Sequence, residues 1–472
     1  MNSATLDLRD GRRLALLGLV PICLLVAFAV VYSPWIISGV LFGALLLLLV
    51  IFRPLVLVAF MLAIGPADLS FITGGFKALF PEVGGLDMNG IRLVGVTAGF
   101  LLLLLVQRGV QVEAIGKQGR WYAVFLIYAA ASIVTSYSPV DGLRLLLKLA
   151  YPFLTFIVVA GLVEREEELD SLVRWTLATS VVVLLLNPFM LVGIAYTVDP
   201  LGYKRIGGLG TYANPFSFYL MVVLFISLAR FMVRGQMRYL GLCALFGIWI
   251  YLTLTRITLL GVFAGIAVMA LYAGVARRGY KAMAGPVLVG LLVGVPLMAP
   301  ALERSLGFMP TPSEVITLIR SPAALYESIN WQGRDALWPI VYGSFAGDRL
   351  TGLGLGSSTV VLKQYMPAQV GYVPHNEYLR LASEAGLIGV ALFFLAILKW
   401  FIGAWRAGLA ASPRGREFAL AALGGIVGWA CVALTDNPFD YYSALTQYIG
   451  FLCAGAMLCA RFQDGGDQAA PL

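Results

Sequence analysis

The sequence predicts an all-α polytopic membrane protein with about 12–14 transmembrane helices. Three observations lead to this fold class. First, 60% of the 472 residues are apolar, only 12% are charged, and the mean hydropathy is +0.88, which leaves too few charges to cover a water-soluble surface. Second, apolar runs long enough to cross a bilayer recur along most of the chain. Third, the basic residues gather in alternate connections between these runs, as in multi-span proteins.

Each apolar run of about 17–25 residues is a candidate for one membrane-spanning helix. Most candidates are joined by short connections. The third is the least regular, because its apolar run stops at Ile64, before Gly65-Pro66-Ala67-Asp68. The candidate spans lie near 14–32, 35–52, 54–72, 91–107, 121–137, 143–163, 172–197, 215–234, 239–255, 257–276, 282–301, 385–405, 417–435 and 442–460.

The positions of the basic residues predict that both termini face the cytoplasm. With this orientation, most of the 33 lysines and arginines lie in short connections or span ends on the cytoplasmic side. Several of the others lie in one long loop, where charge hardly influences orientation. The net charge of +8 therefore reflects membrane topology. No soluble basic domain is present to bind nucleic acid.

Three connections on the outer side are longer than the rest: 66–90, 198–214 and 302–384. Only the last is long enough to be a small domain. Its pattern predicts a short helix after Ser313 and a second helix from Arg334 to Phe345, so we expect a small, mostly helical cap. The predicted divisions are a transmembrane region with short loops (1–301), an outer loop domain (302–384) and C-terminal spans (385–472).

The only histidine of the chain, His375, stands where the long loop meets the next apolar run. Its neighbours form the stretch Pro374-His375-Asn376-Glu377-Tyr378, and a helix that enters the membrane is expected to begin here. An imidazole accepts and releases protons near neutral pH, so His375 is the first candidate for acid–base chemistry. A structural histidine is the alternative. Without a second histidine or a suitable cysteine, no metal site is expected.

Two arginines are predicted to lie on the same outer side. Arg205 precedes Gly207-Gly208-Leu209-Gly210, whose backbone N–H groups could approach an anion closely. Arg256 stands in Thr255-Arg256-Ile257-Thr258, between two apolar runs with almost no connection, and an arginine at membrane depth usually marks a functional cavity. Either arginine could instead extend to lipid head groups. A single kinked segment over 239–276 would place Arg256 differently.

Other polar residues are supporting candidates. Arg334 is either a phosphate ligand or a partner of Asp335 or another carboxylate. Glu377 and Glu384 would orient His375, or are simply solvated in the loop. The glycine run 352–356 follows no strand and lacks the lysine of a P-loop, so a close turn is favoured over a nucleotide site. The supporting candidates are Lys204, Arg334, Asn376, Glu377 and Glu384.

Taken together, these stretches resemble the bacterial O-antigen ligase and polymerase family. The resemblance covers roughly residues 200–400 and rests on the order and spacing of the motifs around one long loop. The motifs are Arg205…Gly207-Gly208…Asn214-Pro215, Thr255-Arg256-Ile257-Thr258, Gly333-Arg334…Trp338, Gly352-Leu353-Gly354 and Pro374-His375-Asn376-Glu377-Tyr378-Leu379…Glu384-Ala385-Gly386-Leu387-Ile388-Gly389.

The resemblance implies a multi-span glycosyltransferase of the bacterial inner membrane that works on the periplasmic side without cofactor, nucleotide sugar or metal. Its donor would be a glycan on undecaprenyl diphosphate. The acceptor would be lipid A–core for a ligase or another lipid-linked glycan for a polymerase, and both remain open. The family's functional histidine would fall on His375, and its external arginines on Arg205 and Arg256.

The chemistry of the residues agrees with this expectation. A diphosphate leaving group needs nearby positive charge, which Arg205 and Arg256 would supply through bidentate guanidinium groups. An attacking hydroxyl needs a base, which would be His375. A single displacement predicts inversion at the anomeric carbon. The hypothesis requires that the three side chains converge on one pocket at one membrane face.

A lipid-linked glycan flippase or a polysaccharide exporter is the main alternative function. A transporter of this kind would need charged residues in several spans around a central cavity. Here the unusual charges gather at one membrane face and in one loop, which favours an enzyme that acts on one side. A receptor or scaffold is a third possibility.

Overall fold

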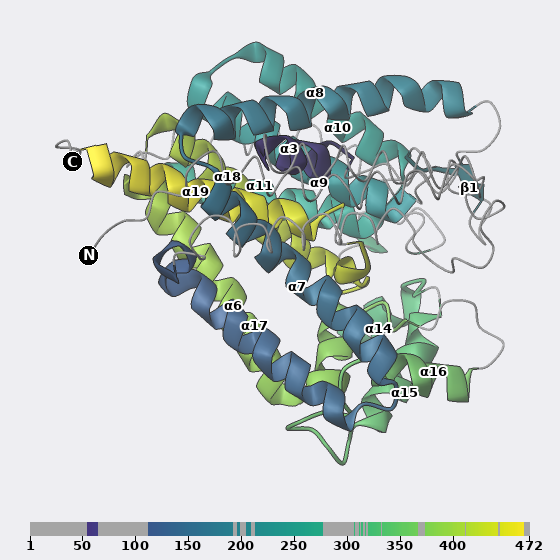
Figure 1. Cartoon of the computed structure of the whole chain (residues 1–472). Coiled ribbons are helices and arrows are strands. Elements are labelled where there is room, and N and C mark those ends of the chain that lie inside the picture. The colour runs from purple at the N-terminus through teal and green to yellow at the C-terminus, as the bar shows by residue number, and fades with distance from the viewer. Residues whose placement is uncertain are drawn as a thin grey trace, which may run out of the picture. The chain divides into compact units, whose positions relative to one another are not determined.

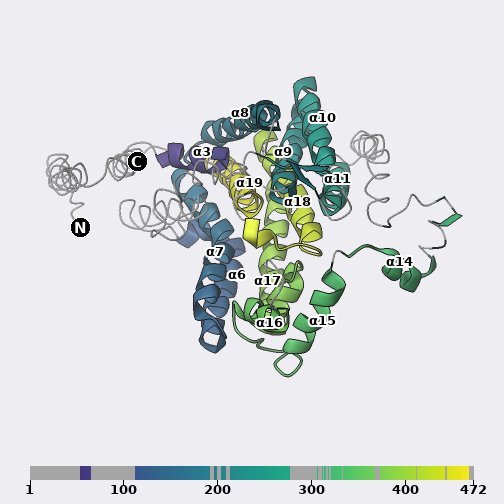
Figure 2. The same cartoon turned by 90° about the vertical axis from the view of Figure 1, so that its right-hand side faces the viewer.

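The structure, a computed structural model, shows an all-α polytopic membrane protein (Figures 1 and 2). Its contacts divide the chain into two compact units, Met1–Val58 and Ala59–Leu472, and the site described below lies within the second. The structure describes residues 54–64, 112–191, 196–198, 204–208, 213–276, 306, 311, 313–314, 317, 320–331, 333–366, 373–410, 412–441 and 444–466.

Among the described residues, six helices have the length and apolar composition of a membrane span: α7, α8, α9, α11, α17 and α18. Shorter apolar stretches occupy α6 and α10. The helices are α3 Pro54–Ile64, α6 Val112–Ser132, α7 Pro139–Leu162, α8 Glu166–Leu191, α9 Ala213–Arg234, α10 Met237–Leu252, α11 Arg256–Ala276, α14 Pro322–Ser328, α15 Arg334–Ser344, α16 Ser357–Tyr365, α17 Glu377–Ala410, α18 Pro413–Val432 and α19 Thr446–Gly466. Two short 3₁₀ helices are η1 Ile133–Thr135 and η2 Pro438–Tyr441.

Several of the predicted spans lie outside the described residues. The third predicted span is described only as α3, so the total of fourteen stays a prediction. Over 239–276 the structure contains two helices, α10 and α11, joined by a turn at 253–255, and the single kinked segment is therefore wrong. The predicted spans that lie wholly outside the described residues are 14–32, 35–52, 91–107 and 282–301.

Two predicted boundaries differ from the structure. The span expected over 172–197 ends earlier, since Tyr196–Val198 is strand β1 and pairs antiparallel with β2, Lys204–Ile206. The span expected from 385 belongs to α17, which begins already at Glu377 and is kinked at Gly386 (φ 67°, ψ −176°). A Cβ at this glycine would lie 2.2 Å from the Leu350 carbonyl oxygen, so only glycine fits the kink.

The crossing of α11 and α18 places the N-terminus of α11 beside the C-terminus of α18, and both ends belong to the site described below. Gly261 and Gly265 of α11 face Gly428 and Gly424 of α18, so closely that added Cβ atoms would lie 3.0 and 2.9 Å from the opposing carbonyl oxygens. Paired small residues four apart allow such close approach of membrane helices. Because the two helices are antiparallel, the start of α11 lies beside the end of α18.

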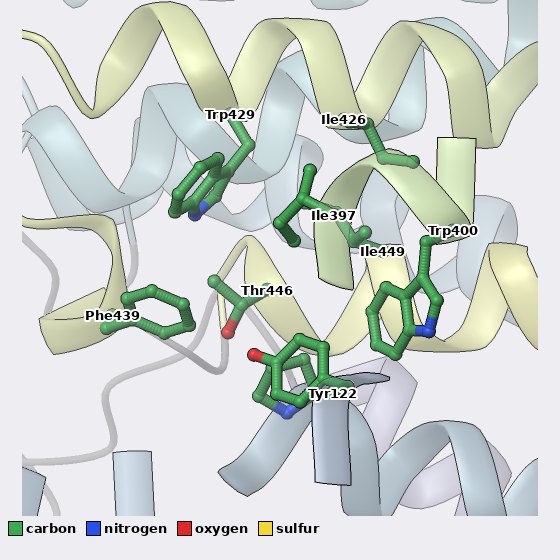
Figure 3. A pocket seen from close by; sticks show the side chains of 9 residues that line it. Tyr122, Ile397, Trp400, Ile426, Trp429, Phe439, Thr446 and Ile449 are labelled. Carbon is green, nitrogen blue, oxygen red and sulfur yellow. The ribbon is translucent and has the colours of Figure 1, made fainter. Parts of the chain in front are cut away.

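An aromatic core holds the segment that follows α18. Phe439 in η2 packs against Trp429 and Phe393, with ring centroids 5.5 and 5.8 Å apart. Figure 3 shows Trp429, Phe439, Tyr122 and Thr446 around a small space from different directions. The space measures about 10 Å³, room for at most about one water molecule. Close packing on this scale restricts movement of the segment 436–441.

Ion pairs join α8, α9 and α18 at the end of the bundle where α9 finishes and α18 begins. Arg230, only 2% exposed, lies 2.6 Å from Asp170, and Arg234 lies 2.6 Å from Glu417. Buried charges of this kind need partners to be tolerated. The other end of the same helices carries the candidate site.

Candidate functional site

Arg205 is presented by the hairpin of β1 and β2. Its backbone lies opposite Thr197 in the antiparallel register. The guanidinium group donates to the Thr253 carbonyl oxygen at 3.2 Å, to Thr255 Oγ1 at 2.9 Å and to Asn214 Oδ1 at 2.5 Å. Arg205 therefore joins the hairpin to the turn between α10 and α11 and to the first turn of α9.

A series of polar contacts continues from Arg205 to His375. Asn214 Nδ2 donates to Asp436 Oδ2 at 2.7 Å, and Asp436 Oδ1 lies 3.4 Å from Nδ1 of His375. Asp436 is only 1% exposed, whereas the imidazole side chain is 32% exposed. The series Arg205–Asn214–Asp436–His375, called the polar series below, connects a cation, an amide, a buried carboxylate and a partly accessible imidazole.

Backbone strain is concentrated beside the polar series. Among the described residues, the non-glycine residues with positive φ are Leu254 and His375, each at 50°. Leu254 lies between the two threonines that accept hydrogen bonds from Arg205, and His375 ends the series. Such conformations cost roughly 1–3 kcal/mol each and persist where the surroundings impose them, commonly at functional sites.

Arg256 and Arg334 lie around the same place. Arg256 Nη2 donates to the Asn330 carbonyl oxygen at 3.3 Å. Arg334 Nε donates at 3.0 Å to the carbonyl oxygen of Thr435, the residue before Asp436, and Nη1 donates to the Trp331 carbonyl oxygen at 3.2 Å. The partner expected for Arg334, Asp335, is exposed and is not among these acceptors.

Four helices begin at the site: α9 beside Asn214, α11 at Arg256, α15 at Arg334 and α17 two residues after His375. A helix N-terminus carries partial positive charge and free N–H groups. Three arginines surround Asp436, and the first turns of α15 and α17 also carry the acids Asp335 and Glu377. Guanidinium groups are the side chains that bind a diphosphate best.

The loop that carries His375 is held on both sides. Trp338 of α15 donates from its indole Nε1 to the Pro374 carbonyl oxygen at 2.9 Å. Asn376 Oδ1 accepts from the backbone N–H of Leu379 at 2.9 Å, which is the geometry of an N-cap for α17. Asn376, predicted as a supporting residue, thus fixes the start of the helix that follows His375.

Glu377 does not contact His375, contrary to the role expected for it. It is completely buried and pairs with Arg380 at 2.7 Å, and Arg380 pairs with Asp440 at 2.8 Å. Lys148 of α7 contacts Asp440 from the other side at 2.7 Å. Burial alone would raise the pKa of Asp440, but Arg380 and Lys148 hold that pKa below its usual value.

Removing the arginine from this buried cluster is expected to destabilise the protein. Arg380→Ala would leave Glu377 and Asp440 without their shared cation, at a cost of about 3–5 kcal/mol in the free energy of unfolding. Thermal unfolding of the purified protein in detergent measures the loss. Lys148→Ala, whose side chain is 34% exposed, is the control with a smaller expected shift. An unchanged unfolding temperature for Arg380→Ala would contradict a structural role for the cluster.

Glu384 is also buried, and its partners lie at the start of α16. Its carboxylate accepts from the backbone N–H of Gly356 at 2.9 Å and from the hydroxyl of Ser358 at 2.5 Å. Three positive-φ glycines, at 352, 354 and 356, pack this turn against α17, the α6–α7 connection and the first turn of α7. The glycine run 352–356 is therefore a close turn, as predicted. Glu384 caps the N-terminus of α16, and this is not the role of orienting His375 that was expected for it.

An open cleft of about 500 Å³ is lined by Asn376, the residue after His375. It lies between α15 and the first half of α17, and it continues past the kink at Gly386. Most of its lining is apolar or aromatic. The lining residues are Tyr342, Phe345, Arg349, Asn376, Tyr378, Leu379, Ala382, Leu387 and Val390.

The structure thus joins Arg205 to His375 through two successive residues, Asn214 and Asp436. Arg334 donates to Thr435, the residue before Asp436, and Arg256 follows Thr255, a partner of Arg205. For Lys204 the structure describes the backbone, which pairs with Val198. Sequence reasoning missed Asp436, because the predicted span 417–435 ends one residue before it. A signal was available, since a carboxylate beside an apolar run is costly near a membrane and commonly functional.

The comparisons with known proteins agree with the resemblance in the sequence motifs. A family model described as O-antigen ligase matches residues 241–394, which confirms the resemblance over that segment. The match contains Arg256, Arg334 and His375, whereas Arg205 and Asp436 lie outside it. No curated protein matches the chain.

Proposed function

We propose that this protein, whose residues 241–394 match a family model described as O-antigen ligase, transfers a glycan from undecaprenyl diphosphate to a sugar hydroxyl at the periplasmic face of the bacterial inner membrane. The observation that carries the proposal is the polar series from Arg205 to His375. It combines a guanidinium group, which would bind the diphosphate, with an imidazole beside a buried carboxylate, which would act as the base.

The proposed reaction is one displacement. The acceptor hydroxyl oxygen bonds to the anomeric carbon while the bond from that carbon to the diphosphate oxygen breaks. His375 takes the hydroxyl proton on Nε2, and Asp436 beside Nδ1 orients the ring and stabilises the imidazolium that forms. Arg205 and Arg256 offset the charge on the leaving diphosphate. The anomeric configuration is inverted.

The cleft between α15 and α17 suits an apolar chain of a lipid-linked substrate. Its lining is mainly aromatic and aliphatic, and it includes Asn376, the chain neighbour of the proposed base. Phe394 and Leu398 are about half exposed on the same helix and extend the apolar surface along α17. A polyprenyl or acyl chain held there would keep the polar head of the substrate near His375.

The distribution of charge supports a periplasmic site with both termini in the cytoplasm. At the end of the bundle away from His375, arginines cluster at helix ends and in short connections. A surplus of arginine and lysine in short loops is typical of the cytoplasmic side. These residues include Arg174, Arg230, Arg234, Arg238 and Arg414.

Deleting the gene for this protein from its own cells tests the proposed function and distinguishes a ligase from a polymerase. Without a ligase, we expect long lipid-linked chains that are not attached to lipid A–core. Without a polymerase, we expect products with a single repeat unit. The glycans are resolved by gel electrophoresis and mass spectrometry, with re-expression of the wild-type chain as the control. Surface and lipid-linked glycans of normal length and attachment would contradict the proposal.

A further inference from the structure

We propose that Trp331 and Trp338 form an aromatic surface that binds the first sugar of the lipid-linked donor, next to the diphosphate. The inference rests on the proposed glycosyl transfer and adds the part of the site that recognises the carbohydrate. It is carried by contacts that place the backbone of Trp331 beside Arg256 and Arg334, and the indole of Trp338 between the Trp331 ring and the His375 loop.

Trp331 belongs to a segment fixed between two arginines of the site. Its carbonyl oxygen accepts from Arg334, both from the backbone N–H and from Nη1, at 3.2 Å each. The carbonyl oxygen of the preceding residue, Asn330, accepts from Arg256 Nη2. Arg334 also donates to Thr435, beside Asp436. The backbone of Trp331 therefore lies next to the groups expected to bind the diphosphate, to which the first sugar of the donor is covalently joined.

Trp338 connects Trp331 to the His375 loop. The two indole rings meet edge to face, with centroids 5.4 Å apart and an interplanar angle of 62°. The Nε1–H group of Trp338 donates to the carbonyl oxygen of Pro374, the residue before His375. Trp338 also packs against the buried cluster of Leu337, Val341 and Leu362. The pair is thus held in one geometry, which limits the entropy lost when a ligand binds.

The chemistry of the pair suits a sugar ring. A pyranose has C–H groups on its faces and hydroxyl groups around its rim. An indole face is electron-rich and attracts polarised C–H groups, and it also covers apolar area. Both side chains are partly exposed, unlike the fully buried Trp400 and Trp429 of the core. A ring stacked on this pair would have its anomeric carbon near the arginines and its other end directed away from them.

Lipid binding by the purified full chain in nanodiscs tests the inference. The probes are undecaprenyl diphosphate and undecaprenyl diphosphate that carries one N-acetylglucosamine. We expect the wild-type protein to bind the sugar-bearing lipid more tightly. Trp331→Ala should weaken that binding roughly three- to tenfold and leave the affinity for the bare lipid unchanged. Trp331→Phe, which keeps a ring, should retain most of the preference. Trp175→Ala, at an exposed tryptophan of α8, is the matched control.

The outcomes separate the inference from the proposed function. If the wild-type chain binds neither lipid, the proposed function fails and the inference fails with it. If it binds both lipids equally, or if Trp331→Ala keeps the preference for the sugar-bearing lipid, the inference alone is wrong. An equal loss for both lipids in Trp331→Ala would also overturn it, because the indole would then support the fold and not the sugar.

Discussion

His375→Ala is expected to lower glycan transfer by about 10²–10⁴-fold, the usual contribution of a positioned general base. The protein should still insert and bind its donor, because the described contacts of the imidazole amount to one long approach to Asp436 and the arginines keep their partners. Transfer is measured with purified protein, a lipid-linked glycan donor and the acceptor, and protein level is checked by immunoblot. Transfer at the wild-type rate would end the assignment of His375 as the base.

Asp436→Asn is the companion variant for the same prediction. The asparagine keeps the size of the side chain, but it loses the negative charge that would stabilise the imidazolium. It also has one acceptor oxygen where Asp436 uses two, toward Asn214 and toward Asn437 and His375. We therefore expect a large loss of transfer with little change in donor affinity. Asp141→Asn, at a partly exposed acid of α7, is the matched control. If Asp436→Asn instead loses donor binding and keeps the catalytic rate, Asp436 serves the diphosphate site and not the imidazole.

Arg205→Ala is expected to raise the KM for the lipid-linked donor by roughly 10- to 100-fold, the equivalent of one lost charge-assisted hydrogen bond. Inorganic diphosphate should inhibit the wild-type enzyme and should inhibit the variant less. Arg144→Ala is the control, because that side chain is 72% exposed on α7. The effect should fall on donor binding, since Asn214 and Asp436 lie between Arg205 and His375 in the polar series.

A second variant separates the ligand role of Arg205 from its structural role. Thr255→Val removes one of the acceptors that hold the guanidinium but keeps its charge. If Arg205 binds the diphosphate, Thr255→Val should have a much smaller effect on KM than Arg205→Ala. Equal effects of the two substitutions, with diphosphate inhibition unchanged in Arg205→Ala, would show that the arginine only joins the hairpin to the α10–α11 turn.

The local pattern of the sequence was enough to predict most described helices. Long apolar runs specify membrane helices because every backbone polar group must be satisfied inside the bilayer, and α7, α9, α11 and α18 lie close to where the runs predicted them. The helix from Arg334 to Phe345 was predicted almost to the residue, since α15 spans Arg334–Ser344. The predicted helix boundaries were wrong where a tertiary contact sets them. The span predicted from residue 385 is part of α17, which begins at Glu377 and kinks at Gly386, where the backbone lies against the carbonyl of Leu350.

By itself, the sequence determined the membrane fold class, the single histidine and the set of arginines near it, because hydropathy and residue type are local properties. Only the tertiary structure decided which carboxylate lies beside His375. Glu377 and Glu384 are near in the chain, yet α17 turns them toward Arg380 and the start of α16. Asp436, 61 residues away, reaches the imidazole because α18 ends there, held by its glycine-mediated crossing with α11 and by the aromatic packing of η2. Such a contact depends on how helices cross, and no local pattern of residues records it.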